Sequence, residues 1–472
     1  MIRKTDPQTI APYLTDGSNF SGGSADEVII PESVDELIIF LKSNDRPITI
    51  AGAGTGVTAS CIPESGLIIS LERFVELGNI INASVDVGPA VSLAQLNDYL
   101  EPSQYFYPPN PTESLASIGG TLATNASGAR SYKYGATRDY VLEADIVLAD
   151  GRALSLSRGD TIDQPLKFSD GSEESFPEIS YTSPKCKNAA GYYVRPGMDW
   201  LDLFIGSDGT LGIVTRIRLK LLPRPASFIS GVLFFESEEA SWHLVSSIRN
   251  SDDEFINPCS LEYFDRRSLD RLKNKFEDIP LDAESALFFE NDINLQEEYD
   301  LALEAWFDYL NGKGVLLDDS WFAQKPNDLK RFHEFRHTIP VMLNEENSRL
   351  GRIKIGTDMA VSDSHLLDVM RFYKGELLKR DIDYVIFGHL GDNHLHINLL
   401  PETHQIDQAH DIYNILVKQI LEWNGTVSAE HGIGKLKKNY FSQMVGESSL
   451  EELRSIKKMF DPNLFLGRGN IL

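Results

Sequence analysis

The chain has 472 residues, with 44 Lys plus Arg against 70 Asp plus Glu, and a formal net charge of −26 at pH 7. This length suits two or three domains, and the negative charge argues against nucleic-acid partners and anionic membrane surfaces. Because we find no apolar signal segment, no run of roughly 20 apolar residues and only 3 widely spaced cysteines, we expect a cytoplasmic protein without disulfides.

The first predicted elements alternate strand, helix and strand. Residues 27–30 form an apolar strand, a helix begins at Ser33, and residues 47–50 form the next strand. A glycine-rich loop, residues 51–60, follows directly. It is not the Rossmann fingerprint, because the third glycine is misplaced and Pro63 prevents an immediate helix. Its small side chains leave backbone N–H groups able to cradle a pyrophosphate, and a plain tight turn explains the loop equally well.

Two further segments rich in small residues follow in the first half. Residues 108–140 are dense in Gly, Ala, Ser and Thr, which lets the backbone approach a flat ligand closely. They lead into a strand pair, 143–149 and 153–156, joined by an Asp-Gly turn. Residues 203–215 then feed a strand at 216–222. Loops of this kind suit an extended dinucleotide.

The second half begins after a proline-rich boundary at residues 221–225. The acidic, Gly/Ser-rich stretch before it, residues 161–198, is interpreted as a long surface excursion. Beyond the boundary we expect strands at 231–235 and 287–290 and helices at 238–250 and 295–310. This alternation is typical of a sheet covered by helices, as in a substrate-capping domain.

Residues 387–400, FGHLGDNHLHINLL, predict a two-stranded hairpin with residues 392–393 at its tip. In that register, paired residue numbers sum to 785, so His389 lies opposite His396, roughly 5 Å away at Cβ. Two imidazoles at this separation can hold one metal ion, and Asn398 lies on the same face. The simpler alternative is a hairpin whose histidines are merely half-buried and hydrogen-bonded.

A second polar segment, residues 425–435, has the sequence GTVSAEHGIGK. We expect a strand at residues 426–428 that delivers Glu430 and His431, whose side chains point to opposite sides of an extended chain. One of them can bind a metal while the other faces a substrate. Together with His389 and His396, a carboxylate completes a set suited to a divalent transition metal. A surface acid beside a hydrogen-bonded histidine is the alternative.

Several motifs together resemble a known superfamily. PITIAGAGTGVTAS, SIGGTLATNASG, YGATRDYV and FIGSDGTLGIVT resemble the flavin-binding half of the vanillyl-alcohol-oxidase and p-cresol-methylhydroxylase (PCMH) superfamily. GHLGDNHLHIN and SAEHGIGK resemble the C-terminal half of its branch of D-lactate, D-2-hydroxyglutarate and glycolate enzymes. The resemblance implies an α+β fold, with a two-subdomain PCMH-type FAD-binding domain over residues 1–224. An α+β cap domain with an antiparallel sheet is expected over residues 225–472.

The resemblance also implies roles for individual residues. His389, His396 and Glu430 are expected to bind the metal, and His431 is expected to act as the base. Arg336, on a helix predicted at residues 329–336, is the candidate for binding the substrate carboxylate, and Asn398 completes the catalytic set. The residues expected to bind FAD are Gly52, Ala53, Gly54, Thr55, Gly56, Thr58, Pro109, Thr112, Gly119, Gly120, Thr124, Asn125, Gly128, Tyr134, Gly135, Asp208, Gly212 and Ile213.

These expectations combine into one reaction. The protein would oxidise a D-2-hydroxy acid to the 2-oxo acid, with FAD accepting a hydride and a divalent metal assisting, zinc first and iron or manganese as alternatives. Electrons would pass to an electron-transfer flavoprotein, a quinone or a cytochrome, and a homodimer is one option. Two alternatives stay open: a metal-dependent hydrolase with a nucleotide-binding domain, and a flavin-binding subunit without turnover.

The chain departs from the family pattern at several positions. Gly356 stands where members that bind a second carboxylate have lysine. This weakens the case for D-2-hydroxyglutarate unless Lys354 reaches in. Lys354 and Arg352 are weaker candidates than Arg336 for binding a substrate carboxylate. His394 replaces the usual asparagine, and so becomes an extra metal ligand or a substrate contact. Residues 467–470, GRGN, replace Asn-Pro-Gly-Lys, which puts one flavin contact in doubt.

Overall fold

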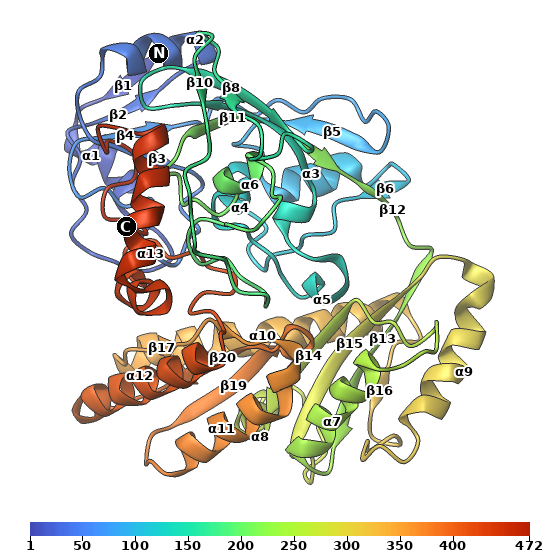
Figure 1. Cartoon of the computed structure of the whole chain (residues 1–472). Coiled ribbons are helices and arrows are strands. Elements are labelled where there is room, and N and C mark those ends of the chain that lie inside the picture. Colours follow the sequence, from blue (N-terminus) through green and yellow to red (C-terminus); the bar gives the residue numbers. More distant parts are fainter.

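The computed structural model describes residues 1–472 apart from the side chain of Pro326. In Figure 1 the chain forms a first half, blue to green, that faces a second half built on one large sheet, light green to orange. None of the described helices is long and apolar enough to cross a membrane.

The first half contains a small sheet with the strand order β1-β2-β4-β3. Its strands are β1 (Ile2–Lys4), β2 (Glu27–Ile30), β3 (Ile48–Ala51) and β4 (Leu67–Ser70). β2, β3 and β4 run parallel and are largely buried, which explains their continuous apolar sequence. After α1 (Pro7–Ile10), helix α2 (Val34–Ser43) begins at the N-cap Ser33, as predicted. The predicted order of strand, helix and strand is confirmed.

A second, antiparallel sheet of the first half has the order β5-β11-β7-β8. Its strands are β5 (Ser84–Val87), β7 (Val141–Val147), β8 (Ala153–Ser157) and β11 (Ile213–Lys220). The Asp-Gly turn joins β7 to β8, which confirms the predicted strand pair. The helices of this region are α3 (Leu93–Leu100), α4 (Ile118–Thr124), α5 (Ser131–Tyr134) and α6 (Leu201–Phe204), and its short strands are β6 (Tyr105–Phe106), β9 (Leu166–Lys167), β10 (Glu173–Glu174) and β12 (Leu222–Pro223).

The second half is organised by a large antiparallel sheet of the order β16-β13-β15-β14-β19-β20-β17, with β18 also paired to β20. Its strands are β13 (Ser227–Phe235), β14 (Ser260–Asp265), β15 (Ser285–Ile293), β16 (Trp321–Phe322), β17 (Ile355–Gly356), β18 (Met359–Ala360), β19 (Tyr384–His389) and β20 (His394–Leu399). The predicted antiparallel sheet is confirmed.

Helices cover both faces of this sheet. Leu233 and Phe235 belong to the apolar core with α7 (Glu238–Arg249), α9 (Tyr299–Leu310), α11 (Leu366–Leu378) and α12 (Ile406–Glu422). Val232 and Phe234 belong to a separate core with α8 (Arg266–Leu272) and α10 (Pro326–Leu350). Alternate residues of a strand point to opposite faces. Phe264 belongs to the core with α10 and lines a cavity that first-half loops also line, so the face covered by α10 looks toward the first half.

The predicted histidine hairpin forms, but its register differs from the prediction. Paired residue numbers sum to 783, so His389 lies opposite His394 and Phe387 lies opposite His396. The expected pairing of His389 with His396 is wrong because the connection is a 3-10 turn, residues 390–392, closed by Asn393 with φ +53°. Since the shift preserves the alternation of side chains, His389, His396 and Asn398 still share one face.

The end of the chain returns to the first half. Helix α13 (Lys438–Phe460) lies beside the blue sheet in Figure 1, and Phe460 packs against Phe204 with ring centroids 5.0 Å apart. Just beyond it, the Ile48 N–H donates to the Phe465 carbonyl at 2.7 Å. Residues 438–472, which the sequence analysis expects in the cap, therefore pack on the first half.

The excursion at residues 161–198 is only partly at the surface. Residues 169–182 are mostly exposed, in keeping with the prediction. The interpretation is wrong for its last part, because Ala190 and Tyr192 are fully buried and the Tyr192 hydroxyl bonds Thr210 at 2.8 Å. This buried end carries Lys187 into the interior between the two halves.

Candidate functional site

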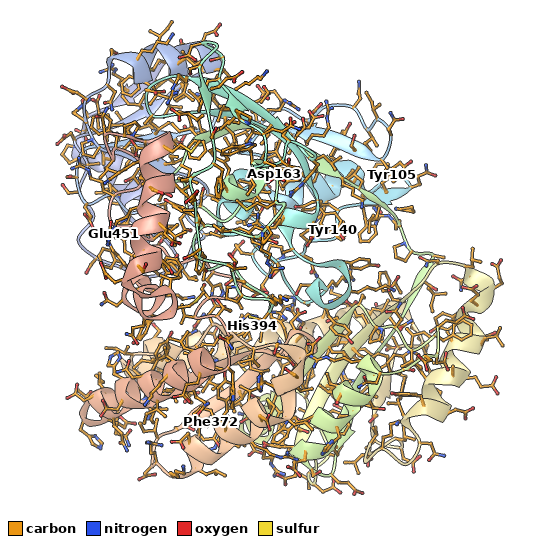
Figure 2. The ribbon with its side chains drawn as sticks, in the orientation of Figure 1. Tyr105, Tyr140, Asp163, Phe372, His394 and Glu451 are labelled. Carbon is orange, nitrogen blue, oxygen red and sulfur yellow. The ribbon has the colours of Figure 1, made fainter. Side chains whose placement is uncertain are left out.

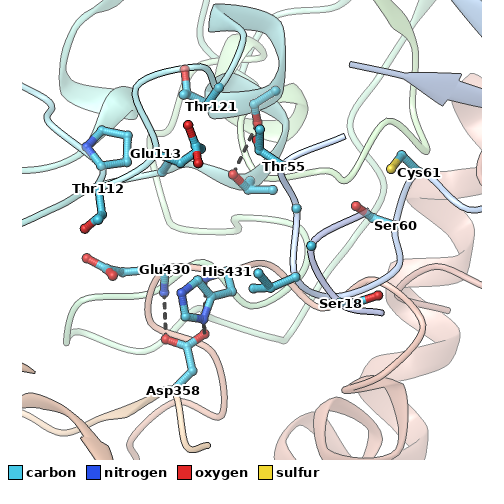
Figure 3. A pocket seen from close by; sticks show the side chains of 18 of the residues that line it. Ser18, Thr55, Ser60, Cys61, Thr112, Glu113, Thr121, Asp358, Glu430 and His431 are labelled. Atoms are coloured by element: carbon cyan, nitrogen blue, oxygen red, sulfur yellow. Dashed lines mark hydrogen bonds and ion pairs between the residues drawn. The ribbon is translucent and has the colours of Figure 1, made fainter. Parts of the chain in front are cut away.

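A cavity of about 1730 Å³ lies between the two halves. Glycine-rich loops of the first half line one side, and side chains of the large sheet, α10 and the segment around Glu430 line the other. Figure 3 shows the Thr55 loop across the cavity from Glu430, His431 and Asp358. Pockets for ordinary small ligands measure roughly 300–1,000 Å³, so this cavity has room for a dinucleotide and a small substrate together.

Most residues expected to bind FAD line this cavity. They are Gly52, Ala53, Gly54, Thr55, Gly56, Thr112, Gly119, Gly120, Thr124, Gly128, Asp208 and Gly212. The others are not among the lining residues: Thr58, Pro109, Asn125, Tyr134, Gly135 and Ile213. Asn125, for example, ends α4 in a left-handed conformation, and its side chain accepts from the Arg138 N–H at 2.9 Å. A motif thus mixes residues that face the ligand with residues that shape the loop.

Asp208 tests whether this lining suits a ligand. Its Oδ2 accepts from the Ile433 and Gly434 N–H groups at 3.1 and 2.8 Å, whereas its buried Oδ1 has no hydrogen-bond partner among the described residues. Burial raises the pKa of Asp208 to about 6, and the two N–H donors oppose this shift. Small residues and an unpaired acceptor fit a polar, flat cofactor such as FAD.

Four side chains converge where β19, β20 and the 430 segment meet. His389, His394, His396 and Glu430 each offer one ligand atom, and these atoms all lie within 4.8 Å of one another. Figure 2 shows His394 at the junction of the two halves. Three imidazoles and one carboxylate fit a divalent transition metal. His394 therefore joins the predicted set of His389, His396 and Glu430.

Local backbone geometry permits this convergence. Gly388 has φ +130°, and a Cβ there would lie 3.1 Å from His396 Cδ2, so glycine lets the two histidine-bearing strands pair. The expected strand at residues 426–428 is wrong, because Thr426 makes only an isolated bridge to Ala360 among the described residues. Beyond it, Glu430 turns toward His389 and His431 toward Asp358.

Neighbouring acceptors orient the imidazoles. His389 Nδ1 contacts Glu262 Oε1 at 2.6 Å, and His396 Nδ1 contacts the Thr357 carbonyl at 3.2 Å. Each ring then keeps Nε2 for a metal, the arrangement by which outer partners set the tautomer of a ligand. Burial and the neighbouring imidazoles hold the pKa of His396 well below its usual range, so this ring is neutral, as a metal ligand must be.

Asp358 is a site residue that the sequence analysis did not identify. Its carboxylate is buried, lies 3.2 Å from His431 Nδ1 and 2.9 Å from His394 Nε2, and contacts the Lys437 ammonium. Burial opposes its charge, but His431 and Lys437 hold the pKa of Asp358 well below its usual range. One signal in the sequence could have revealed it: an acidic residue lies between the apolar residues Ile355 and Met359.

Glu262 is a second residue that sequence reasoning missed. One oxygen contacts His389, and the other accepts from Arg336 Nε at 3.0 Å. Burial opposes its charge, yet His389 and Arg336 lower the pKa of this carboxyl well below its usual range. The helix predicted around Arg336 is confirmed as part of α10, and Arg336 and Asn398 both line the cavity.

The positions that depart from the family pattern have distinct surroundings. Lys354 lines the cavity and donates to Asn344 Oδ1 at 3.0 Å, with no carboxylate within 4.0 Å among the described residues. Arg352 instead contacts Glu402. Gly356 lies opposite Asn398 in the sheet. Asn470 does not line the cavity; it accepts from Lys435 Nζ at 2.7 Å and donates to the Ser60 carbonyl at 2.7 Å, behind the first glycine loop.

Comparison with known proteins agrees with this architecture. Residues 224–471 match the family model of the C-terminal domain of FAD linked oxidases, and residues 25–157 match a FAD binding domain. Among solved structures, an alkyldihydroxyacetonephosphate synthase superposes with a TM-score of 0.69 at 14% identity, covering 98% of this chain and 81% of that one. That likeness supports the fold.

Curated relatives align over almost the whole chain. The chain is 28% identical to the "Glycolate oxidase subunit GlcD" of Bacillus subtilis over 463 residues, covering 94% of this chain and 88% of the relative. It is 27% identical to a "D-lactate dehydrogenase" of Anaerostipes hadrus over 459 residues, with the same coverages of 94% and 88%. These matches favour a flavin-dependent oxidoreductase over the hydrolase alternative.

Proposed function

Because the chain belongs to the FAD linked oxidases, we propose that it oxidises a D-2-hydroxy acid to the 2-oxo acid with the help of a divalent metal. One observation carries the proposal: a cavity lined by glycine-rich loops ends at a cluster of three histidines and Glu430, with His431 beside it. D-lactate, glycolate and D-2-hydroxyglutarate are the substrate candidates. FAD when bound supplies a hydride acceptor, and the metal supplies Lewis acidity.

The proposed division of labour follows the two halves. Residues 1–224 would form the FAD-binding domain, and residues 225–472 would form the cap that carries the substrate and metal site, with residues 438–472 packed back on the first. The lining glycines and Asp208 would hold FAD. His389, His396 and Glu430, with His394, would hold zinc, iron or manganese.

His431 is the proposed proton acceptor. Its Nδ1 faces Asp358 at 3.2 Å, which leaves Nε2 for the substrate hydroxyl. The Asp358 carboxylate then stabilises the imidazolium that forms when the hydroxyl proton arrives. Because the His431 ring stacks on His396 at 5.7 Å between centroids, the proton would be taken next to the cluster of candidate ligands.

Arg336 is the proposed anchor for the substrate carboxylate. Glu262 bonds its Nε and so holds the guanidinium beside His389, which suits a substrate whose carboxylate and hydroxyl are on adjacent carbons. Asn398 would contact the substrate from the same face. The proposed electron acceptor is an electron-transfer flavoprotein, a quinone or a cytochrome, and a homodimer is one option for the assembly.

An anaerobic visible spectrum tests the proposal. We expect the purified protein to show a flavin band that is bleached by one of D-lactate, glycolate or D-2-hydroxyglutarate added separately. His431→Ala should keep FAD and slow this bleaching by about 10²–10⁴-fold, the usual contribution of a general base. A protein that shows no flavin band after reconstitution with FAD would refute the proposed cofactor. Bleaching of the His431→Ala variant at the wild-type rate would refute the role of His431 as proton acceptor.

A further inference from the structure

A buried lysine of the first half reaches the candidate metal ligands. Lys187 Nζ donates to Glu430 Oε1 at 2.5 Å and to Ser131 Oγ at 2.8 Å, and lies 3.3 Å from Asp392 Oδ2. Its side chain is only 9% exposed. Both carboxylates belong to the second half, so Lys187 connects the two halves at the metal cluster.

The two oxygens of Glu430 have different surroundings. Oε1 accepts from Lys187 and from Ser127 Oγ, the latter at 2.8 Å, and lies 3.3 Å from His389 Nε2. Oε2 has neither donor and lies 4.0 Å from His394 Nδ1. Both donors that engage Oε1 therefore come from the first half, and Oε2, which accepts from neither donor, lies toward His394.

We propose that Lys187 is a positioning residue which, with Ser127, engages Glu430 Oε1 so that Oε2 is presented to the metal. The inference rests on the metal-assisted function proposed above. All four candidate ligands belong to the second half, whereas the residues that orient Glu430 belong to the first. Metal affinity consequently depends on how the FAD-binding half docks on the large sheet, and metal binding strengthens that docking in return.

The direction in which metal affinity changes when Lys187 is removed shows whether Lys187 acts by orienting Glu430 or by its charge. An ammonium group beside a metal site repels the metal, so an effect through charge alone would make metal binding tighter when Lys187 is removed. Orientation has the opposite consequence, because loss of an outer partner typically costs 10–100-fold in metal affinity.

The chain offers a matched control for this test. Lys133 also crosses between the halves and pairs with Asp292 at 2.7 Å, but it contacts none of the four candidate ligands. Lys133→Met thus removes a comparable ion pair between the halves and leaves the surroundings of Glu430 unchanged.

The experiment measures zinc affinity of the FAD-loaded protein by equilibrium dialysis against zinc buffers, followed by elemental analysis. We expect Lys187→Met to weaken Zn²⁺ binding by about 10–100-fold and Ser127→Ala to weaken it less. Lys133→Met should bind Zn²⁺ like the wild type, and all three variants should retain FAD.

Several outcomes would overturn the inference. Unchanged or tighter zinc binding by Lys187→Met would refute it, as would an equal loss in Lys133→Met. If Lys187→Met does not fold, Ser127→Ala decides, and unchanged affinity in that variant refutes the role. A wild-type protein that binds no Zn²⁺ refutes the metal site and the inference together. Zinc binding that depends on Lys187 in a protein that reduces no hydroxy acid supports the inference and refutes the proposed reaction.

Discussion

The two sides of the cavity differ in how they are built. On the first half, glycines and small side chains present mainly backbone, and the buried Asp208 Oδ1 has no hydrogen-bond partner among the described residues. On the large sheet, charged side chains bond one another closely, as Glu262 does with His389 and Arg336. In the proposed function, one side would hold its ligand by shape and backbone donors, and the other by a preorganised network of charges.

The largest expected effect comes from removing a histidine of the network. His389→Ala should reduce metal affinity by more than about 100-fold, beyond the loss typical of an outer partner, because it deletes a candidate ligand atom. FAD content should stay unchanged, since no glycine loop is touched. Elemental analysis measures the metal content, and the flavin absorbance of the same sample measures the FAD content. Unchanged metal content would contradict the ligand assignment.

A substitution in a glycine-rich loop should instead affect FAD binding more than metal binding. A Cβ at Gly128 would lie 2.2 Å from the Asn110 carbonyl oxygen and 2.9 Å from the Pro111 nitrogen, so Gly128→Ala must displace backbone beside the cavity that Gly128 and Pro111 line. We expect a loss of about 3 kcal/mol in unfolding free energy, at the upper end of overpacking costs, together with lower FAD occupancy. Thermal unfolding and flavin content measure these effects. Loss of metal to the same extent as FAD would erase the contrast between the two sides.

Asp208 links the glycine side to pH. Its pKa is raised to about 6 in the folded protein, above the unfolded value of about 3.9. The unfolded chain therefore releases this proton first, and stability falls as pH rises from about 4 to 6. Two pKa units correspond to at most about 3 kcal/mol.

Replacing Asp208 tests this dependence. Asp208→Asn keeps an acceptor for the Ile433 and Gly434 N–H groups and removes the buried charge. Without FAD, the variant should be more stable than the wild type above pH 6, and the difference should vanish near pH 4. Melting temperatures at both pH values measure it, and an unchanged difference across this range would count against the buried charge.

The smallest expected effect concerns substrate length. Lys354 lines the cavity and has no carboxylate partner within 4.0 Å among the described residues. Lys354→Met should raise KM about two- to tenfold for a 2-hydroxy acid with a distal carboxylate, in keeping with an exposed charge contact. KM for D-lactate should not change. Steady-state kinetics on D-lactate and D-2-hydroxyglutarate compare the two, and equal effects would remove Lys354 from substrate recognition.

The sequence by itself determined the local features of this protein. Apolar alternation and turn residues predicted the strands of the first half, the hairpin and the helix around Arg336, because each depends on neighbours within a few residues. Parity along a strand placed His396 and Asn398 on one face, and the two-residue shift in register left His389 on that same face. The small-residue loops predicted the side of the cavity that is expected to bind FAD.

Only the tertiary structure decided which charged groups meet. Glu262 contacts His389 across 127 residues of sequence, and Lys187 contacts Glu430 across 243. No local pattern records such pairs, because strand pairing within the large sheet brings Glu262 to His389 and packing of the two halves brings Lys187 to Glu430. The 3-10 turn at residues 390–392 likewise set the hairpin register and paired His389 with His394. Tertiary contacts thus turned a pair of predicted histidines into a network that includes Asp358, Glu262 and Lys187.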